Sequence, residues 1–184
     1  MRKENTYLFP PILRPEILAA TPGAGEHLLI YQSGANEALQ AALADTGIEC
    51  RVYGMRENLT EETRQGTLRF MPFSEDRFIS DLATCRAVIA GGGFTLMGEA
   101  VFLGKPMLAV PIAGQFEQML NARYLEREGF GMWTEDFDDA AVIPRFLEHT
   151  AEYAHGLAKY SQHGNTEILA AVDEFLERAA TEPR

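Results

Sequence analysis

Three consecutive glycines, Gly91–Gly93, stand between an apolar run and a segment with helical character. Because they lack side chains, the backbone can approach a ligand closely, and the N–H groups at the start of a helix attract an anion. Glu99 follows one helical turn after Thr95, where its carboxylate can accept two charge-assisted hydrogen bonds from a pair of hydroxyls. This combination predicts a ligand that carries both phosphate and hydroxyl groups, and a nucleotide sugar is such a ligand. The alternatives are packing for the glycines and a favourable helix-dipole contact for the acid.

A second set of polar residues follows the next apolar run. Gln115, Glu117 and Gln118 come after Pro111, at the expected start of another helix. At the carboxyl end of a parallel strand they would lie on the ligand-binding edge of a sheet, where amide and carboxylate groups can distinguish sugar hydroxyls. Helix capping is the alternative explanation. Asn121, farther along the same helix, is expected to satisfy backbone groups inside the fold.

A third turn, Ser33-Gly34, precedes Asn36 at the end of the first apolar run. It could offer a hydroxyl and N–H groups to a phosphate, and helix capping by Ser33 or Asn36 is equally compatible with the pattern. Asp136-Phe137-Asp138 matches an Asp-x-Asp pattern that can chelate a divalent ion, but its place before helical sequence favours capping. No metal site and no cofactor are therefore predicted.

The composition narrows the classes of partner. The formal net charge of -11 argues against nucleic acid and against an anionic membrane surface. No apolar run approaches the roughly 20 residues of a membrane-spanning helix, and the first residues lack a segment typical of a signal peptide. The two cysteines, Cys50 and Cys85, fit a reduced environment. We therefore expect a cytoplasmic location.

Apolar runs alternate with helical patterns along most of the chain, which predicts βαβ units and a Rossmann-like α/β fold with a parallel sheet. Residues 1–25, rich in Pro and Gly, are interpreted as a linker-like segment on the surface, and residues 26–184 as a nucleotide-sugar-binding domain. From Pro144 onward a helical tail is expected, with Asn165 as a candidate cap. The predicted strands are 27–32, 48–53, 68–70, 87–90, 107–110 and 132–133. The predicted helices are 36–45, 76–84, 95–103 and 116–128.

The segment 88–122, with its Gly-Gly-Gly-Phe-Thr, Gly-Glu, Gly-Lys-Pro and Glu-Gln-x-x-Asn-Ala motifs, resembles the C-terminal, donor-binding domain of GT-B glycosyltransferases. It is most similar to the family 28 enzymes, such as the N-acetylglucosaminyltransferase that completes the lipid-linked peptidoglycan precursor. The resemblance implies a UDP-sugar donor and hexosyl transfer without a metal. It implies that Glu99 binds the uridine ribose. The other implied donor-binding residues are Arg14, Ser33, Gly34, Pro72, Phe73, Gly92, Gly93, Phe94, Thr95, Leu96, Glu117 and Gln118.

Within that set the resemblance assigns separate roles. Thr95, Leu96 and the Gly92-Gly93 turn would line the diphosphate, with Arg14 and Ser33 near the phosphates. Pro72 and Phe73 would flank the uracil, and Glu117 with Gln118 would meet the donor sugar.

GT-B enzymes have two domains, and the acceptor domain, which usually holds the general base, precedes the donor domain. The resemblance therefore implies that this chain is either an excised donor domain or the donor subunit of a split enzyme. The catalytic residues are not assigned. A UDP-sugar 2-epimerase of the same architecture and a non-catalytic interaction module are the alternatives.

Overall fold

A computed structural model describes residues 6–181 and shows a seven-stranded sheet in the order β3-β4-β2-β1-β5-β6-β7. All neighbouring strands are parallel except β3, which pairs antiparallel to β4 at one edge. The prediction of a Rossmann-like α/β fold is confirmed. The strands are β1 (Leu28–Tyr31), β2 (Cys50–Tyr53), β3 (Thr63–Gln65), β4 (Leu68–Phe70), β5 (Ala87–Ala90), β6 (Met107–Ala109) and β7 (Gly131–Trp133).

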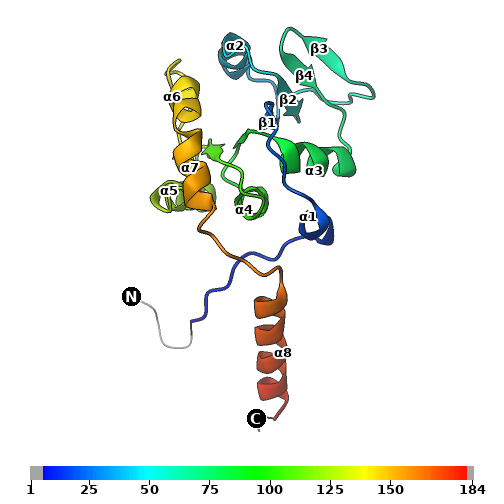
Figure 1. The fold of residues 1–184 in the computed structure, drawn as a ribbon, viewed down its shortest axis with the longest axis vertical. Coiled ribbons are helices and arrows are strands. Elements are labelled where there is room, and N and C mark those ends of the chain that lie inside the picture. The colour runs from blue at the N-terminus through cyan, green and yellow to red at the C-terminus, as the bar shows by residue number, and fades with distance from the viewer. Residues whose placement is uncertain (1–5, 182–184) are drawn as a thin grey trace.

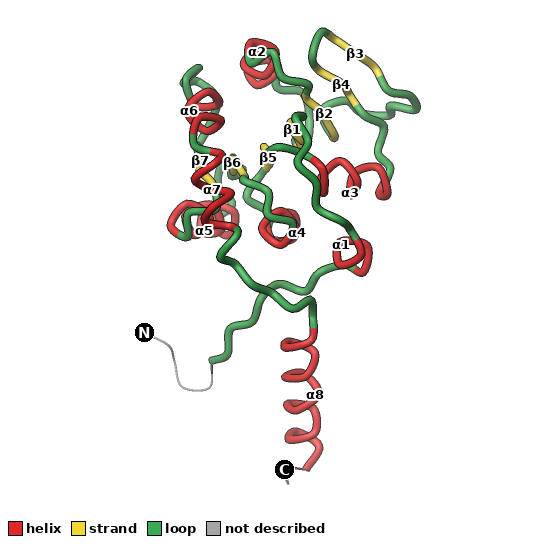
Figure 2. Tube along the Cα trace, in the orientation of Figure 1, coloured by secondary structure: helices red, strands yellow, loops and turns green. Residues whose placement is uncertain are grey.

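Helices cover both faces of the sheet, and the last helix stands away from the α/β body (Figures 1 and 2). The helices are α1 (Pro15–Ala19), α2 (Glu37–Asp45), α3 (Glu75–Thr84), α4 (Phe94–Phe102), α5 (Phe116–Arg127), α6 (Val142–Glu148), α7 (Thr150–Leu157) and α8 (Thr166–Thr181). No helix in the described part of the chain combines the length and apolarity that crossing a membrane requires.

The strand order reverses at β1, which lies between β2 and β5. The loops that follow β1 and β5 therefore leave the sheet in opposite directions at the carboxyl ends of the strands. Ligands of open α/β sheets bind at such a switch point. The Ser33-Gly34 turn and the three glycines follow these two strands.

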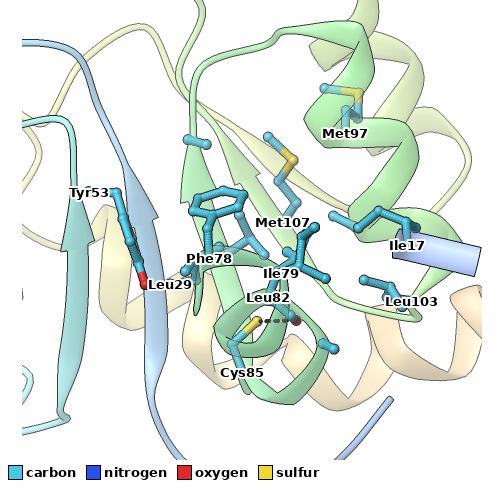
Figure 3. Close-up of a cluster of buried hydrophobic side chains, with 14 of the residues drawn as sticks. Ile17, Leu29, Tyr53, Phe78, Ile79, Leu82, Cys85, Met97, Leu103 and Met107 are labelled. Carbon is cyan, nitrogen blue, oxygen red and sulfur yellow. Dashed lines mark hydrogen bonds between the residues drawn. The ribbon is translucent and has the colours of Figure 1, made fainter. Parts of the chain in front are cut away.

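Alternation along the strands divides the core into two clusters, because successive side chains point to opposite faces. Leu29 lies in the cluster beneath α1, α3, α4 and α5, whereas Leu28 and Ile30 lie in the cluster beneath α2 and α6. Figure 3 shows the first cluster, where Ile17 and Met97 approach from their helices.

The linker-like interpretation of residues 1–25 missed one helix. Pro15 occupies the first turn of α1, and both Leu13 and Ile17 are buried in the core. Leu13 lies in the segment just before the N-cap Arg14, and Ile17 lies in the helix itself, so both sides of the helix start pack on the core. This part of the segment is not confined to the surface. Residues 1–5 lie outside the described part.

The helical tail divides into α6, α7 and α8. Pro144 lies in the first turn of α6, as predicted. Asn165 directly precedes α8, but its side chain contacts a distant segment: Nδ2 donates to the carbonyl of Leu13, and Oδ1 accepts from the N–H of Leu13, both at 2.8 Å. These two bonds fasten the start of the tail to the segment before α1.

Candidate functional site

A cavity of about 300 Å³ opens at the carboxyl edge of the sheet. Its volume lies at the lower end of the range of about 300–1,000 Å³ for small-molecule sites. It is lined by Arg14, Tyr31, Phe73, Glu75, Phe78, Thr95, Leu96 and Glu99. Five of these residues belong to the predicted donor-binding set, and they come from three segments far apart in the sequence.

The charged part of this cavity is built around Glu99. The Glu99 side chain is only 2% exposed, and both its oxygens accept hydrogen bonds from Arg14: Nε donates to Oε1 at 2.7 Å and Nη2 donates to Oε2 at 3.0 Å. Nη1 of Arg14 donates to Glu75 Oε1 at 2.5 Å. The bond to Glu99 is the main cause that raises the pKa of Arg14. The guanidinium thus bridges a buried and an exposed carboxylate.

The second and third of the three glycines have different roles. A β-carbon on Gly92 would lie 2.4 Å from the backbone carbonyl of Gln118, so only glycine allows α5 to approach so closely. A β-carbon on Gly93 would meet nothing within 4 Å. Gly93 is the N-cap of α4 and has no side chain to satisfy the first N–H groups of the helix. Those groups, beside Thr95 and Leu96, can therefore bind an anion.

Two polar side chains of α5, those of Gln118 and Asn121, hold the neighbouring loops, whereas that of Glu117 is exposed. Gln118 Oε1 accepts from the N–H of Gly92 at 3.2 Å and from that of Ile112 at 3.1 Å, which ties two loops of the site together. Asn121 Nδ2 donates to the carbonyl of Gly92 at 3.0 Å, so its predicted backbone role is confirmed. Glu117 is exposed.

The remaining predicted residues lie outside the cavity lining. Ser33 and Gly34 are exposed after β1, and the N–H of Gly34 donates to the carbonyl of Gly54. Asn36 caps α2, because its side chain accepts from the N–H of Leu39. The other two, Pro72 after β4 and Phe94 at the start of α4, are half-buried and exposed respectively.

Sequence reasoning missed three residues of the cavity. Tyr31 ends β1, and its ring packs edge-on against Phe78, with 5.7 Å between the centroids. Glu75, in the first turn of α3, holds the outer side of Arg14. The position of Tyr31 at the end of the first strand could have indicated its role, but nothing near Glu75 in the sequence points to Arg14.

A larger hollow of about 700 Å³ lies at the opposite, amino edge of the sheet. Its Arg51 is held by Glu49 and by the buried Asp81, so its charge is used within the protein. Because ligands of this fold bind at the carboxyl ends of the strands, we place the candidate site in the smaller cavity.

The Asp-x-Asp pattern forms a local turn. The N–H of Asp138 donates to Asp136 Oδ1 at 3.0 Å. The expected capping role is wrong for both acids, because the N-cap of α6 is Ala141, whose N–H donates to Asp139. Over residues 6–181, no group of three His, Cys, Asp or Glu side chains could hold a metal ion.

Comparisons with known proteins agree with this architecture. An uncharacterised glycosyltransferase of Methanosarcina acetivorans is 30% identical over 124 residues, which cover 66% of this chain and 31% of that relative. Spinosyn forosaminyltransferase SpnP superposes with a TM-score of 0.59 at 18% identity, over 88% of this chain and 47% of the other. Spinosyn rhamnosyltransferase SpnG, solved in complex with thymidine diphosphate, has a TM-score of 0.58 at 20% identity, over 85% and 48%.

This chain therefore spans less than half the length of these relatives. The family described as Glycosyl transferase family 1 matches residues 1–150, most of the chain. The chain belongs to glycosyl transferase family 1.

Proposed function

We propose that this chain is the donor-binding part of a glycosyltransferase that transfers a hexosyl group from a UDP-sugar to an acceptor. The observation that carries the proposal is the single cavity in which Arg14, Phe73, Thr95, Leu96 and Glu99 meet at the switch point of the sheet. A buried carboxylate, an exposed aromatic ring and a helix N-terminus within one hollow match the three parts of a nucleoside diphosphate.

Each part of the donor has a partner in this proposal. The Glu99 carboxylate accepts hydrogen bonds from the two ribose hydroxyls. Phe73, 75% exposed, offers a ring face to the uracil, with Pro72 beside it. The N–H groups at the start of α4, after Gly93, bind the diphosphate. The predicted phosphate contacts of Ser33 and Gly34 and the sugar contacts of Glu117 and Gln118 stay predictions.

The proposed chemistry is electrostatic and needs no metal. When the glycosidic bond of the donor breaks, negative charge develops on the leaving diphosphate. The N-terminus of α4 and the guanidinium of Arg14 stabilise that charge, because donors fixed in place need no reorganisation during the reaction. This is a contribution to the leaving group and leaves activation of the acceptor to another part of the enzyme.

The acceptor site and the general base belong, in this proposal, to a preceding domain or a partner subunit. The matched relatives are about twice as long as the part that this chain covers, or longer. In this proposal the chain is the C-terminal half of such an enzyme, which the resemblance of residues 88–122 to family 28 supports. A cytoplasmic location is part of the same proposal.

Isothermal titration of the chain with UDP tests the donor assignment. We expect saturable binding, and we expect Glu99→Ala to weaken it by about tenfold or more, because a charge-assisted bond contributes about 1.5–3 kcal/mol. Thymidine diphosphate lacks the ribose 2′-hydroxyl, so it should bind more weakly than UDP and be less affected by the substitution. Glu148→Ala, at an exposed acid of α6, is the control and should leave binding unchanged.

Absence of UDP binding at millimolar concentrations would overturn the donor assignment. Equal affinities of Glu99→Ala and the unmodified chain for UDP would overturn the ribose role of Glu99 alone.

A further inference from the structure

In the free protein the carboxylate that should bind the ribose is already occupied. Arg14 takes both oxygens of Glu99 in a two-point contact, and the Glu99 side chain is 2% exposed. A pair of neighbouring hydroxyls would need the same two oxygens from the same open side. We propose that Arg14 is an internal competitor for the ribose site, which a phosphorylated nucleoside displaces and an unphosphorylated nucleoside does not. This inference rests on the proposed function and adds a selectivity to it.

The geometry allows Arg14 to leave while Glu99 stays. Arg14 is the N-cap of the short helix α1, and its side chain is 37% exposed at the rim of the cavity. Its second partner, Glu75, is 54% exposed. Glu99 lies within α4 and is buried. A rotation of the Arg14 side chain can therefore release Glu99 and keep the guanidinium near Glu75 and solvent.

The charges explain why phosphate is needed. Ribose hydroxyls are neutral donors, so they replace the guanidinium bonds to a buried carboxylate with weaker ones. The exchange is unfavourable unless the displaced guanidinium finds another anion. A diphosphate at the N-terminus of α4 is such an anion, and Thr95 and Glu99, one turn apart on that helix, line the same cavity. Ribose binding and phosphate binding are thus coupled through one side chain.

Arg14→Met removes the competitor and gives the sharpest test. Titration calorimetry of the chain with uridine and with UDP is compared for the unmodified protein, Arg14→Met and Arg14→Lys. We expect Arg14→Met to bind uridine about tenfold tighter and UDP no tighter, so that the ratio of the two affinities falls about tenfold or more. Arg14→Lys keeps the positive charge but loses the two-point fork, so its ratio should lie between the two.

Arg145→Met is a matched control, because it also removes a guanidinium that donates to a carboxylate, at 3.0 Å from Asp139 on the α6 side of the sheet. It should leave both affinities unchanged. Thermal melts check that each variant is folded. Arg14→Lys keeps the test valid if the unpaired Glu99 destabilises Arg14→Met.

Two results would overturn the inference and leave the proposed function standing: uridine affinity that falls together with UDP affinity, which would make Arg14 a positioning residue for Glu99, or an unchanged ratio in both variants. If the unmodified chain and both Arg14 variants bind neither uridine nor UDP, the inference and the proposed function fail together.

Discussion

The N–H of Gly92 donates to Oε1 of Gln118 at 3.2 Å, and the backbone carbonyl of Gln118 lies where a side chain on Gly92 would begin. These two residues hold the loop after β5 against the first turns of α5. The contact fixes the middle glycine of the three by packing and leaves the last one, Gly93, facing open space at the start of α4. Packing against α5 therefore requires glycine at position 92, whereas no packing contact requires it at position 93.

Gly92→Ala should destabilise the fold. The new methyl group would lie 2.4 Å from a backbone oxygen that cannot rotate away, so the loop or α5 has to shift. Overpacking of this kind costs about 1–3 kcal/mol. Urea denaturation measures the loss, and a midpoint equal to that of the unmodified chain would contradict the packing role.

Gly93→Ala should have the opposite profile. Gly93 has φ of -66° and ψ of 132°, which any residue adopts, and a β-carbon there meets nothing. We expect a free energy of unfolding within about 1 kcal/mol of the unmodified chain, because Ala is a poorer N-cap than Gly but also reduces the freedom of the unfolded chain. UDP affinity should fall several-fold, because the methyl group narrows the approach to the N-terminus of α4. Retained UDP affinity would argue that the phosphates lie elsewhere.

Gln118→Ala should lower stability more than Glu117→Ala does. The Gln118 side chain satisfies the N–H groups of Gly92 and Ile112, whereas Glu117 is exposed. Gly92 is buried, and loss of the acceptor from a buried donor costs about 1–3 kcal/mol; the N–H of the exposed Ile112 can turn to water instead. Thermal melts of the two variants test this order.

Titration of Glu117→Ala with UDP and a UDP-hexose tests the sugar contact. A change in affinity confined to the sugar-bearing ligand supports the contact, and no change in either affinity contradicts it.

Stability in acid should depend on Glu62. Hydrogen bonds from Arg69, then from Arg64 and Arg77, lower the pKa of Glu62 from 4.5 to about 2. Below its ordinary pKa the unfolded chain takes up a proton that the folded chain refuses. The stabilisation is therefore complete above pH 4.5 and is lost as the pH falls from 4.5 toward 2.

Glu62→Gln should thus lower the melting temperature at pH 7 by about 2–4 °C, a change of about 1 kcal/mol in a domain of this size. It should also flatten the decline below pH 4.5. Glu61→Gln, at the exposed neighbouring position, is the control. The interpretation of Glu62 would be wrong if both variants followed the unmodified chain through the acid range.

The elements that the sequence predicted well are those with strong local patterns. β4 and β5 have the predicted limits. β5 is a run of four buried apolar residues, and in β4 two buried apolar residues flank Arg69, an alternation typical of a strand. The missed elements lack such patterns. β3 is a polar strand of three residues, Thr63–Gln65. It forms because a turn at Gly66, with φ of 61°, reverses the chain after β3 so that β4 pairs antiparallel with it.

The site shows the same division. Glu99 could be found from its place after the glycines, because helix periodicity puts it on one face with Thr95. Its partner Arg14 lies 85 residues earlier in the sequence. Glu75, from a third segment, binds the other side of the same guanidinium. Local sequence indicated Glu99 and the resemblance indicated Arg14, but neither indicated Glu75. The ion pairs among the three side chains exist only once the fold brings their segments together.

The side chain of Asn165 hydrogen-bonds to both the N–H and the carbonyl of Leu13, and Leu13 is the residue directly before Arg14. The residue that precedes α8 is therefore hydrogen-bonded to the immediate neighbour of Arg14, whose guanidinium covers Glu99, although Asn165 and Arg14 are 151 positions apart in the sequence. Cutting the polypeptide before Asn165, or replacing that amide, would loosen the anchorage of a charged side chain at the mouth of the pocket while leaving every strand in place. Shortened versions of this polypeptide are therefore poor substitutes for it in nucleotide titrations.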